Sequence, residues 1–131
     1  MLNTISSLNR TLLETQDWLD ALKENGPFET EHQAYSHLRA VLHAVRDRLT
    51  VEEAAHFAAQ LPMLVRGFYY EGWRPALAPN PERTVEEFLD HVRSSLHDEE
   101  TPDSVVGQSV SAVLALLSDR LSEGQIRHVR D

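Results

Sequence analysis

The sequence lacks several residue types and patterns, and each absence excludes a class of chemistry. It contains no cysteine, which excludes disulfides, thiolate metal sites and cysteine nucleophiles. Its longest apolar run, residues 112–117, is far shorter than the roughly 20 residues that a membrane-spanning helix needs. The N-terminus also lacks the basic start and apolar block of a signal peptide. We therefore expect a cytoplasmic protein that does not contact the membrane.

Basic residues are scarce as well. The chain has 12 Lys and Arg against 21 Asp and Glu, a net charge of −9, and the acidic excess is spread over both halves. Nucleic acids and anionic lipid surfaces both attract clustered lysine and arginine. The charge therefore predicts that neither is a partner.

The length and composition predict one helical domain. A chain of 131 residues with 41% hydrophobic residues is long enough to form its own core. No segment shows strand alternation between hairpin turns. The expected fold class is all-α, a compact single-domain bundle of about six to seven helices over residues 1–131.

The first expected helix, residues 4–24, has a narrow apolar stripe with spacings of three and four. The stripe consists of Ile5, Leu8, Leu12, Leu19 and Leu22, with Thr15 in the one polar position. Such a stripe is typical either of a coiled-coil contact with a partner or of a helix that packs along its own bundle. Asn25, Gly26 and Pro27 end this helix.

Capping boxes of the form Thr-x-x-Gln or Thr-x-x-Glu predict three further helix starts, at Thr30, Thr50 and Thr84. Pro62 and Gly72 bound a short helix. A rigid exposed loop follows over residues 75–81, and an acidic linker over 97–102. We expect a long helix over residues 102–121 and a last short helix from Ser122.

The sequence also resembles itself at an offset of 72 residues. Residues 40–50 (AVLHAVRDRLT) align with residues 112–122 (AVLALLSDRLS). This indicates two copies of a helical hairpin, roughly 34–58 and 106–130, added to the N-terminal helix. The second copy stops at Asp131, aligned with Ala59, so either the aromatic segment that follows the first copy has no counterpart or the second repeat is truncated.

The segment 60–73 concentrates four of the nine aromatic residues within six positions, with an arginine and a glutamate among them. Tyr, Trp and Arg are enriched at binding hot spots. The candidate binding patch consists of Arg66, Tyr69, Tyr70, Glu71 and Trp73. The alternatives are that the aromatic residues form core, or that Arg66 is buried and paired with Glu71 or Asp47.

Two segments of this region also resemble a known family. They are residues 39–49 (RAVLHAVRDRL) and 59–73 (AQLPMLVRGFYYEGW), supported by 11–19 (TLLETQDWL) and 87–91 (EFLDH). Together they resemble the bacterial domain-of-unknown-function family 2267 over nearly the whole chain. The resemblance implies a helical fold with two repeats and implies no activity.

No catalytic or metal-binding constellation is evident. Glu53 and His56 have the spacing of a di-metal motif, but residue 125, the repeat counterpart of Glu53, is a glutamine. His43 and Asp47 lie one helical turn apart, without a nucleophile nearby. We therefore expect no catalytic residues, no metal and no cofactor.

Two functions remain open from the sequence. The first is a non-enzymatic protein-interaction or self-assembly module that binds a protein partner or forms a homo-oligomer. The second is a small-ligand-binding protein, or an undescribed enzyme, that uses the Arg66, Tyr69, Tyr70 and Trp73 patch.

Overall fold

The computed structural model describes residues 5–79, 84–96 and 101–121, and these form an all-α bundle without strands. The elements, in chain order, are α1 (Ser6–Asn25), α2 (Glu31–Asp47), α3 (Val51–Ala58), α4 (Met63–Tyr70), the 3-10 turn η1 (Pro75–Leu77), α5 (Val85–Leu96) and α6 (Asp103–Arg120). The predicted fold class and the approximate number of helices are confirmed.

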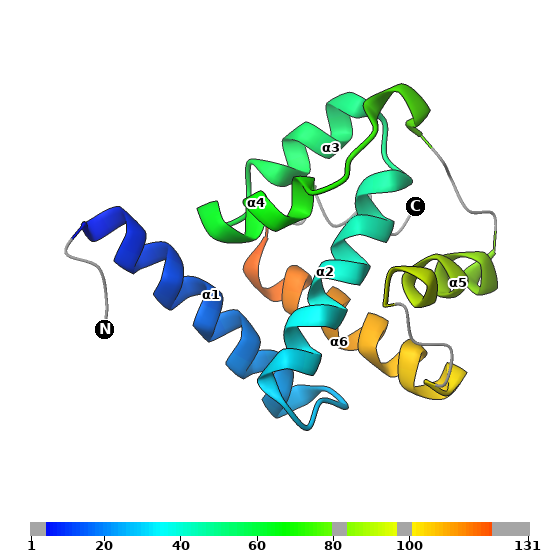
Figure 1. Cartoon of the computed structure of the whole chain (residues 1–131), viewed down its shortest axis with the longest axis horizontal. Helices are drawn as coiled ribbons and strands as arrows, with labels where there is room; N and C mark the ends of the chain where they lie inside the picture. The colour runs from blue at the N-terminus through cyan, green and yellow to red at the C-terminus, as the bar shows by residue number, and fades with distance from the viewer. Residues whose placement is uncertain (1–4, 80–83, 97–100, 122–131) are drawn as a thin grey trace.

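Helix α2 lies at the centre of the bundle (Figure 1). It contacts α1, α4, α5 and α6. Four of its side chains, Leu38, Val41, Leu42 and Val45, have no exposed surface. These are the apolar positions expected from the helical period, and they make α2 the element on which the other helices pack.

The predicted capping boxes form at the starts of α2 and α3. Thr30 Oγ1 accepts a hydrogen bond from the backbone N–H of Gln33, and the Gln33 side chain accepts one from the Thr30 N–H. Thr50 and Glu53 make the same reciprocal pair. At the start of α5, Thr84 Oγ1 accepts a hydrogen bond from the Glu87 N–H. Local hydrogen bonding thus determines where these helices begin.

Helix α4 differs from the prediction by one residue at its start. Pro62 is its N-cap residue instead of its first helical residue, and the helix ends at Tyr70 with Glu71 as the C-cap. Gly72 follows with a φ of 72°, a left-handed conformation that glycine adopts without strain. The chain therefore turns at Gly72, as expected, and brings Trp73 back towards α2.

Helix α1 does not bury the predicted stripe as one face. Its buried side chains are Thr11, Thr15, Trp18, Leu19 and Leu22. Ile5 is 55% exposed and Leu12 43% exposed. The bundle-packing interpretation is thus wrong for the stripe as a whole, because only its C-terminal part packs within the chain. The coiled-coil interpretation stays a prediction.

Hydrogen bonds explain why threonines, instead of apolar residues, occupy two buried positions on the inner face of α1. Thr11 Oγ1 accepts a 2.8 Å hydrogen bond from the backbone N–H of Leu64, in the first turn of α4. Thr15 Oγ1 donates to the carbonyl oxygen of Thr11 at 2.7 Å. The first-turn N–H groups of a helix need acceptors from outside it. Thr11 therefore fixes the rotation of α1 against α4.

The internal repeat is visible only in part. Helix α6 begins at Asp103, 72 residues after α2 begins at Glu31, as the offset requires. The short helix from Ser122, the end of the second copy, and the residues 80–83 and 97–100 of the predicted loop and linker lie outside the described residues. The repeat, and with it the single-domain boundary 1–131, stays a prediction.

Candidate functional site

The aromatic segment divides into a buried part and a half-buried part. Phe68 and Tyr69 are buried, and Tyr69 has no exposed surface. Tyr70 and Trp73 are half-buried and pack against the core. The rings of Tyr69, Tyr70 and Trp73 contact each other in series, with centroids 5.2 and 5.4 Å apart. The predicted patch residues therefore do not form one exposed surface.

Tyr69 has a structural role. Its hydroxyl donates a 2.9 Å hydrogen bond to the carbonyl oxygen of Ala54 in α3, and its ring stacks on Phe57. Burial raises the pKa of the Tyr69 phenol well above its ordinary value. The hydroxyl thus stays protonated and holds α4 against α3.

The alternative in which Arg66 is buried and paired with Glu71 or Asp47 is wrong. Its guanidinium donates to the carbonyl oxygens of Ala58 and Leu61, each at 3.0 Å, and so caps the C-terminal end of α3. Helix C-termini leave unpaired carbonyls that a cation stabilises. Exposed Glu71 instead pairs with Arg39 of α2 at 2.8 Å.

The buried arginine of this region is Arg46, which is not among the predicted site residues. It is 5% exposed. Its Nε donates to Asp47 at 2.8 Å, and its Nη1 donates to the carbonyl oxygens of Tyr69 and Glu71 at 2.9 and 2.7 Å. Arg46 follows Leu42 by one turn on the apolar face of α2, and this position was the signal that could have identified it.

Two ionisable groups beside Arg46 have shifted pKa values. Burial lowers the pKa of His43, although its 2.6 Å hydrogen bond to the carbonyl oxygen of Phe68 opposes this shift. Burial alone would raise the pKa of Asp47, but hydrogen bonds from His91 and Arg46 outweigh it and lower that pKa. His43 and Asp47, which lie one helical turn apart, do not pair with each other, because His43 bonds to α4 and Asp47 bonds to α5.

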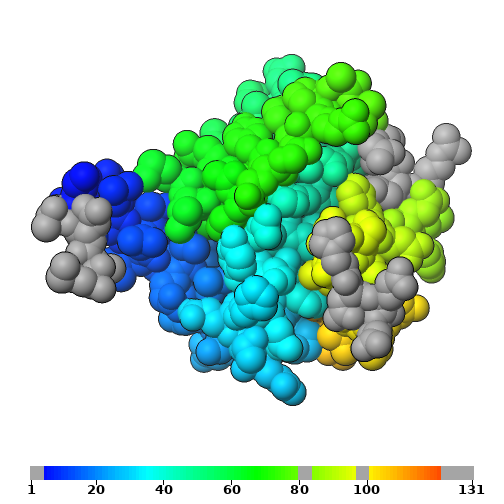
Figure 2. Space-filling model, in the orientation of Figure 1, coloured from blue at the N-terminus to red at the C-terminus, as the bar shows by residue number. Residues whose placement is uncertain are grey.

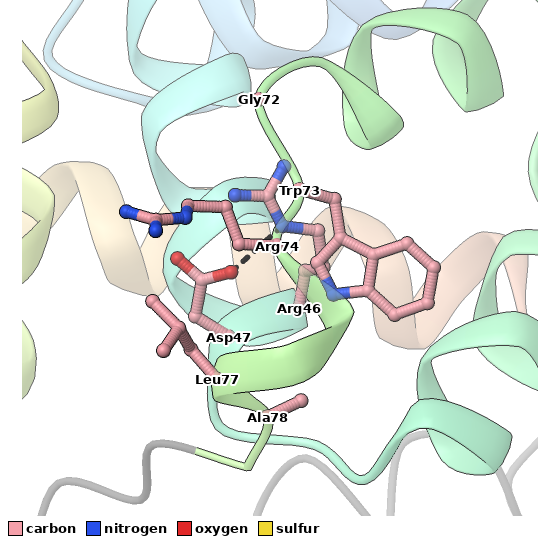
Figure 3. Close-up of a pocket in the computed structure, with 7 residues that line it drawn as sticks. All are labelled: Arg46, Asp47, Gly72, Trp73, Arg74, Leu77 and Ala78. Carbon is pink, nitrogen blue, oxygen red and sulfur yellow. Dashed lines mark hydrogen bonds and ion pairs between the residues drawn. The ribbon is translucent and has the colours of Figure 1, made fainter.

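A small cavity of about 110 Å³ lies at this junction (Figure 3). It is lined by Arg46, Asp47, Gly72, Trp73, Arg74, Leu77 and Ala78. Of the five residues in the predicted patch, only Trp73 lines it. The turn at Gly72 and the 3-10 turn η1 place the other residues around the end of α2.

A second candidate site is an apolar surface at the other end of the molecule. Eight large hydrophobic side chains are exposed among the described residues, and five of them belong to α1, its N-cap or the first turn of α4. These five, which we call the N-terminal apolar surface, are Ile5, Leu12, Leu13, Met63 and Leu64. The first turn of α4 lies beside the N-terminal half of α1 (Figures 1 and 2). Clustered exposed apolar residues typically mark an interaction site.

Two further classes of site are missing from the part of the chain that the structure describes. No group of three or more His, Asp or Glu side chains there is arranged to hold a metal ion. None of the helices there combines the length and the hydrophobicity that crossing a bilayer requires.

The architecture is thus that of a small helical protein with exposed apolar side chains near its N-terminal end and a small cavity at the end of α2. The chain belongs to the family described as an uncharacterized conserved protein, DUF2267, which matches residues 15–131. This confirms the resemblance found in the sequence. No curated protein sequence matches the chain.

Proposed function

We propose that this protein is a non-enzymatic interaction module that self-associates through the N-terminal apolar surface. The observation that supports the proposal most strongly is that α1 buries polar side chains and exposes apolar ones. Its threonines face the bundle, each 7% exposed, whereas Leu12 and Leu13 are 43% and 56% exposed. Leaving leucines in water forgoes roughly 25 cal/mol for each Å² of apolar area. A second copy would recover that free energy.

The shape of α1 favours a second helix as the occupant. The N-terminal end of α1 extends beyond the other helices (Figure 1). Ile5, Leu8 and Leu12 keep the alternating spacing of three and four with which paired helices interlock. Because the same stripe exists on every copy, two chains related by a two-fold axis would each offer the complementary face.

The local charge supports the same partner. A net charge of −9 opposes contact between two copies. Residues 5–13 contain no acidic side chain and one basic side chain, Arg10, so this surface is free of that repulsion. We expect weak association, with a dissociation constant on the order of 10–100 µM, because one pair of short stripes buries less than the roughly 1,200 Å² of a stable interface.

Sedimentation equilibrium across protein concentration tests the proposal. The wild-type protein should show a reversible dimer, and Leu12→Glu should be monomeric at the same concentrations. Val85→Glu is the matched control, because Val85 is 70% exposed on α5. It should dimerise like the wild type. A wild-type protein that stays monomeric up to millimolar concentration, or equal effects of the two variants, would contradict the proposal.

We further propose a cytoplasmic location, supported by the absence of cysteine, which suits a reducing compartment. Fractionation of cells that express the tagged protein tests it. Recovery in an extracellular or membrane fraction would contradict it.

A further inference from the structure

Residues that line the cavity at the end of α2 carry hydrogen-bond donors that have no acceptor among the described residues. The indole Nε1 of Trp73 is buried and has no hydrogen-bond partner among the residues that the structure describes. Figure 3 shows this nitrogen on the edge of the ring that faces Arg46. A buried donor without a partner is unfavourable, and in native proteins it calls for an explanation such as a bound polar group.

Two guanidinium groups add to this set of donors. Arg46 uses Nε and Nη1 for Asp47 and the two carbonyls, and within the described residues its Nη2 has no hydrogen bond. Arg74 lines the same cavity, is exposed, and has no partner in the described part of the chain.

The residues that line the cavity have a net positive charge, whereas the whole chain has a net negative charge. Arg46 and Arg74 contribute two positive charges, and Asp47 contributes one negative charge. Both oxygens of Asp47 are occupied, Oδ1 by Arg46 at 2.8 Å and Oδ2 by His91 at 3.2 Å. One positive charge is left over, in a protein whose net charge is −9.

We propose that this cavity binds the carboxylate group of a small organic acid. A carboxylate has one negative charge, which matches the single excess positive charge, and its two oxygens suit the fork of an arginine. The volume of about 110 Å³ admits a carboxylate with a short tail. Trp73 and Leu77 supply apolar wall for that tail. Inorganic phosphate, which at pH 7 is a mixture of the singly and doubly charged anions and has no apolar part, fits less well.

The test is a titration of the full chain, followed through the indole N–H signals in ¹H–¹⁵N correlation spectra. The chain has two tryptophans, Trp18 and Trp73. Trp18 is 4% exposed in α1 and does not line the cavity, so its signal is an internal control. Trp73→Phe assigns the signals. With sodium propionate at constant ionic strength, the Trp73 signal should shift downfield and saturate while the Trp18 signal stays in place.

Two variants test whether Arg74 binds the propionate, and a second anion tests whether the site prefers a carboxylate. Arg74→Gln should weaken propionate binding by about tenfold or more, the effect of losing one charge-assisted hydrogen bond. Arg10→Gln makes the same change of charge on α1 and should leave the affinity unchanged. Inorganic phosphate should bind more weakly than propionate. The proposal is overturned if the Trp73 signal does not move, if the two variants behave alike, or if phosphate saturates the site at a lower concentration.

Discussion

Arg46 shows how one residue connects three parts of the chain. From α2 it reaches Asp47, the last turn of α4 through the Tyr69 carbonyl, and the turn that follows through the Glu71 carbonyl. Charge-assisted hydrogen bonds of this kind are stronger than neutral ones. They position the segment that ends at Trp73, so the cavity depends on Arg46.

Replacing Arg46 with methionine should therefore lower the free energy of unfolding by about 3 kcal/mol, because it leaves two carbonyls and Asp47 without their donor. Urea denaturation followed by circular dichroism measures the change. Arg48→Met removes a half-buried arginine that lies 5.9 Å from the centre of the Phe88 ring and should cost less than about 1 kcal/mol. Similar losses for the two variants would contradict the role of Arg46.

Removing the hydroxyl of Tyr69 and that of the neighbouring Tyr70 should have different effects on stability. Tyr69→Phe should cost about 1 to 2 kcal/mol, because the buried Ala54 carbonyl loses its donor. The Tyr70 hydroxyl has no hydrogen bond in the described part of the chain, so Tyr70→Phe should change stability by less than about 0.5 kcal/mol. Parallel urea denaturation curves measure both values, and the reverse order would refute the assignment.

His43 should make stability depend on pH. Its pKa in the folded protein is below the ordinary value of 6.5, so the unfolded chain takes up a proton first as the pH falls. The free energy of unfolding should therefore decrease as the pH falls below 6.5. Asp47 does not titrate in this window, because its pKa lies below 3.8.

The matched variant for that measurement is His43→Gln, whose amide can still donate to the Phe68 carbonyl but does not titrate. Urea denaturation at pH 7.5 and pH 5.5 should show a smaller decrease for the variant than for the wild type. An equal decrease in both proteins would assign the pH dependence to other groups.

At the scale of helices, a hydrogen bond between Leu64 and Thr11 determines how α1 and α4 pack. Thr11 accepts from the first turn of α4 and thereby fixes which face of α1 is buried. Thr11→Val keeps the shape and removes the acceptor, so it should cost roughly 1 to 2 kcal/mol. Hydrogen exchange at the Leu64 amide should accelerate in this variant, whereas unchanged exchange would show that the bond contributes nothing.

Sequence patterns predicted helix boundaries well where the cause was local. The Thr30 and Thr50 boxes lie within four consecutive residues, and both form as expected. The prediction of the buried face of α1 was wrong because that face is determined by a contact between distant residues. The acceptor Thr11 and the donor Leu64 are 53 residues apart in the sequence. The pairing considered for Arg66 failed for a different reason: its acceptors are nearby backbone carbonyls, which leave no trace in side-chain spacing.

At the scale of the whole molecule, the sequence predicted the fold class and the family but only part of either candidate site. Trp73 is the one residue shared by the predicted patch and the cavity. Arg74 and Leu77 reach the cavity because of the turn at Gly72 and η1, a path that no periodic pattern encodes. Of the N-terminal apolar surface, only Ile5 and Leu12 belong to the predicted stripe, which was typical either of a partner contact or of bundle packing.

The proposed function requires that α1 packs against α1 of a second copy of the chain. Because the chain has no cysteine, Arg10→Cys provides a single attachment point for a nitroxide label on that helix. Two paired helices of 20 residues lie 8–10 Å apart and span about 30 Å. Double electron–electron resonance should therefore give a label-to-label distance below about 40 Å, and Leu12→Glu should abolish the signal. A dimer without such a distance, or one that survives Leu12→Glu, would contradict the account.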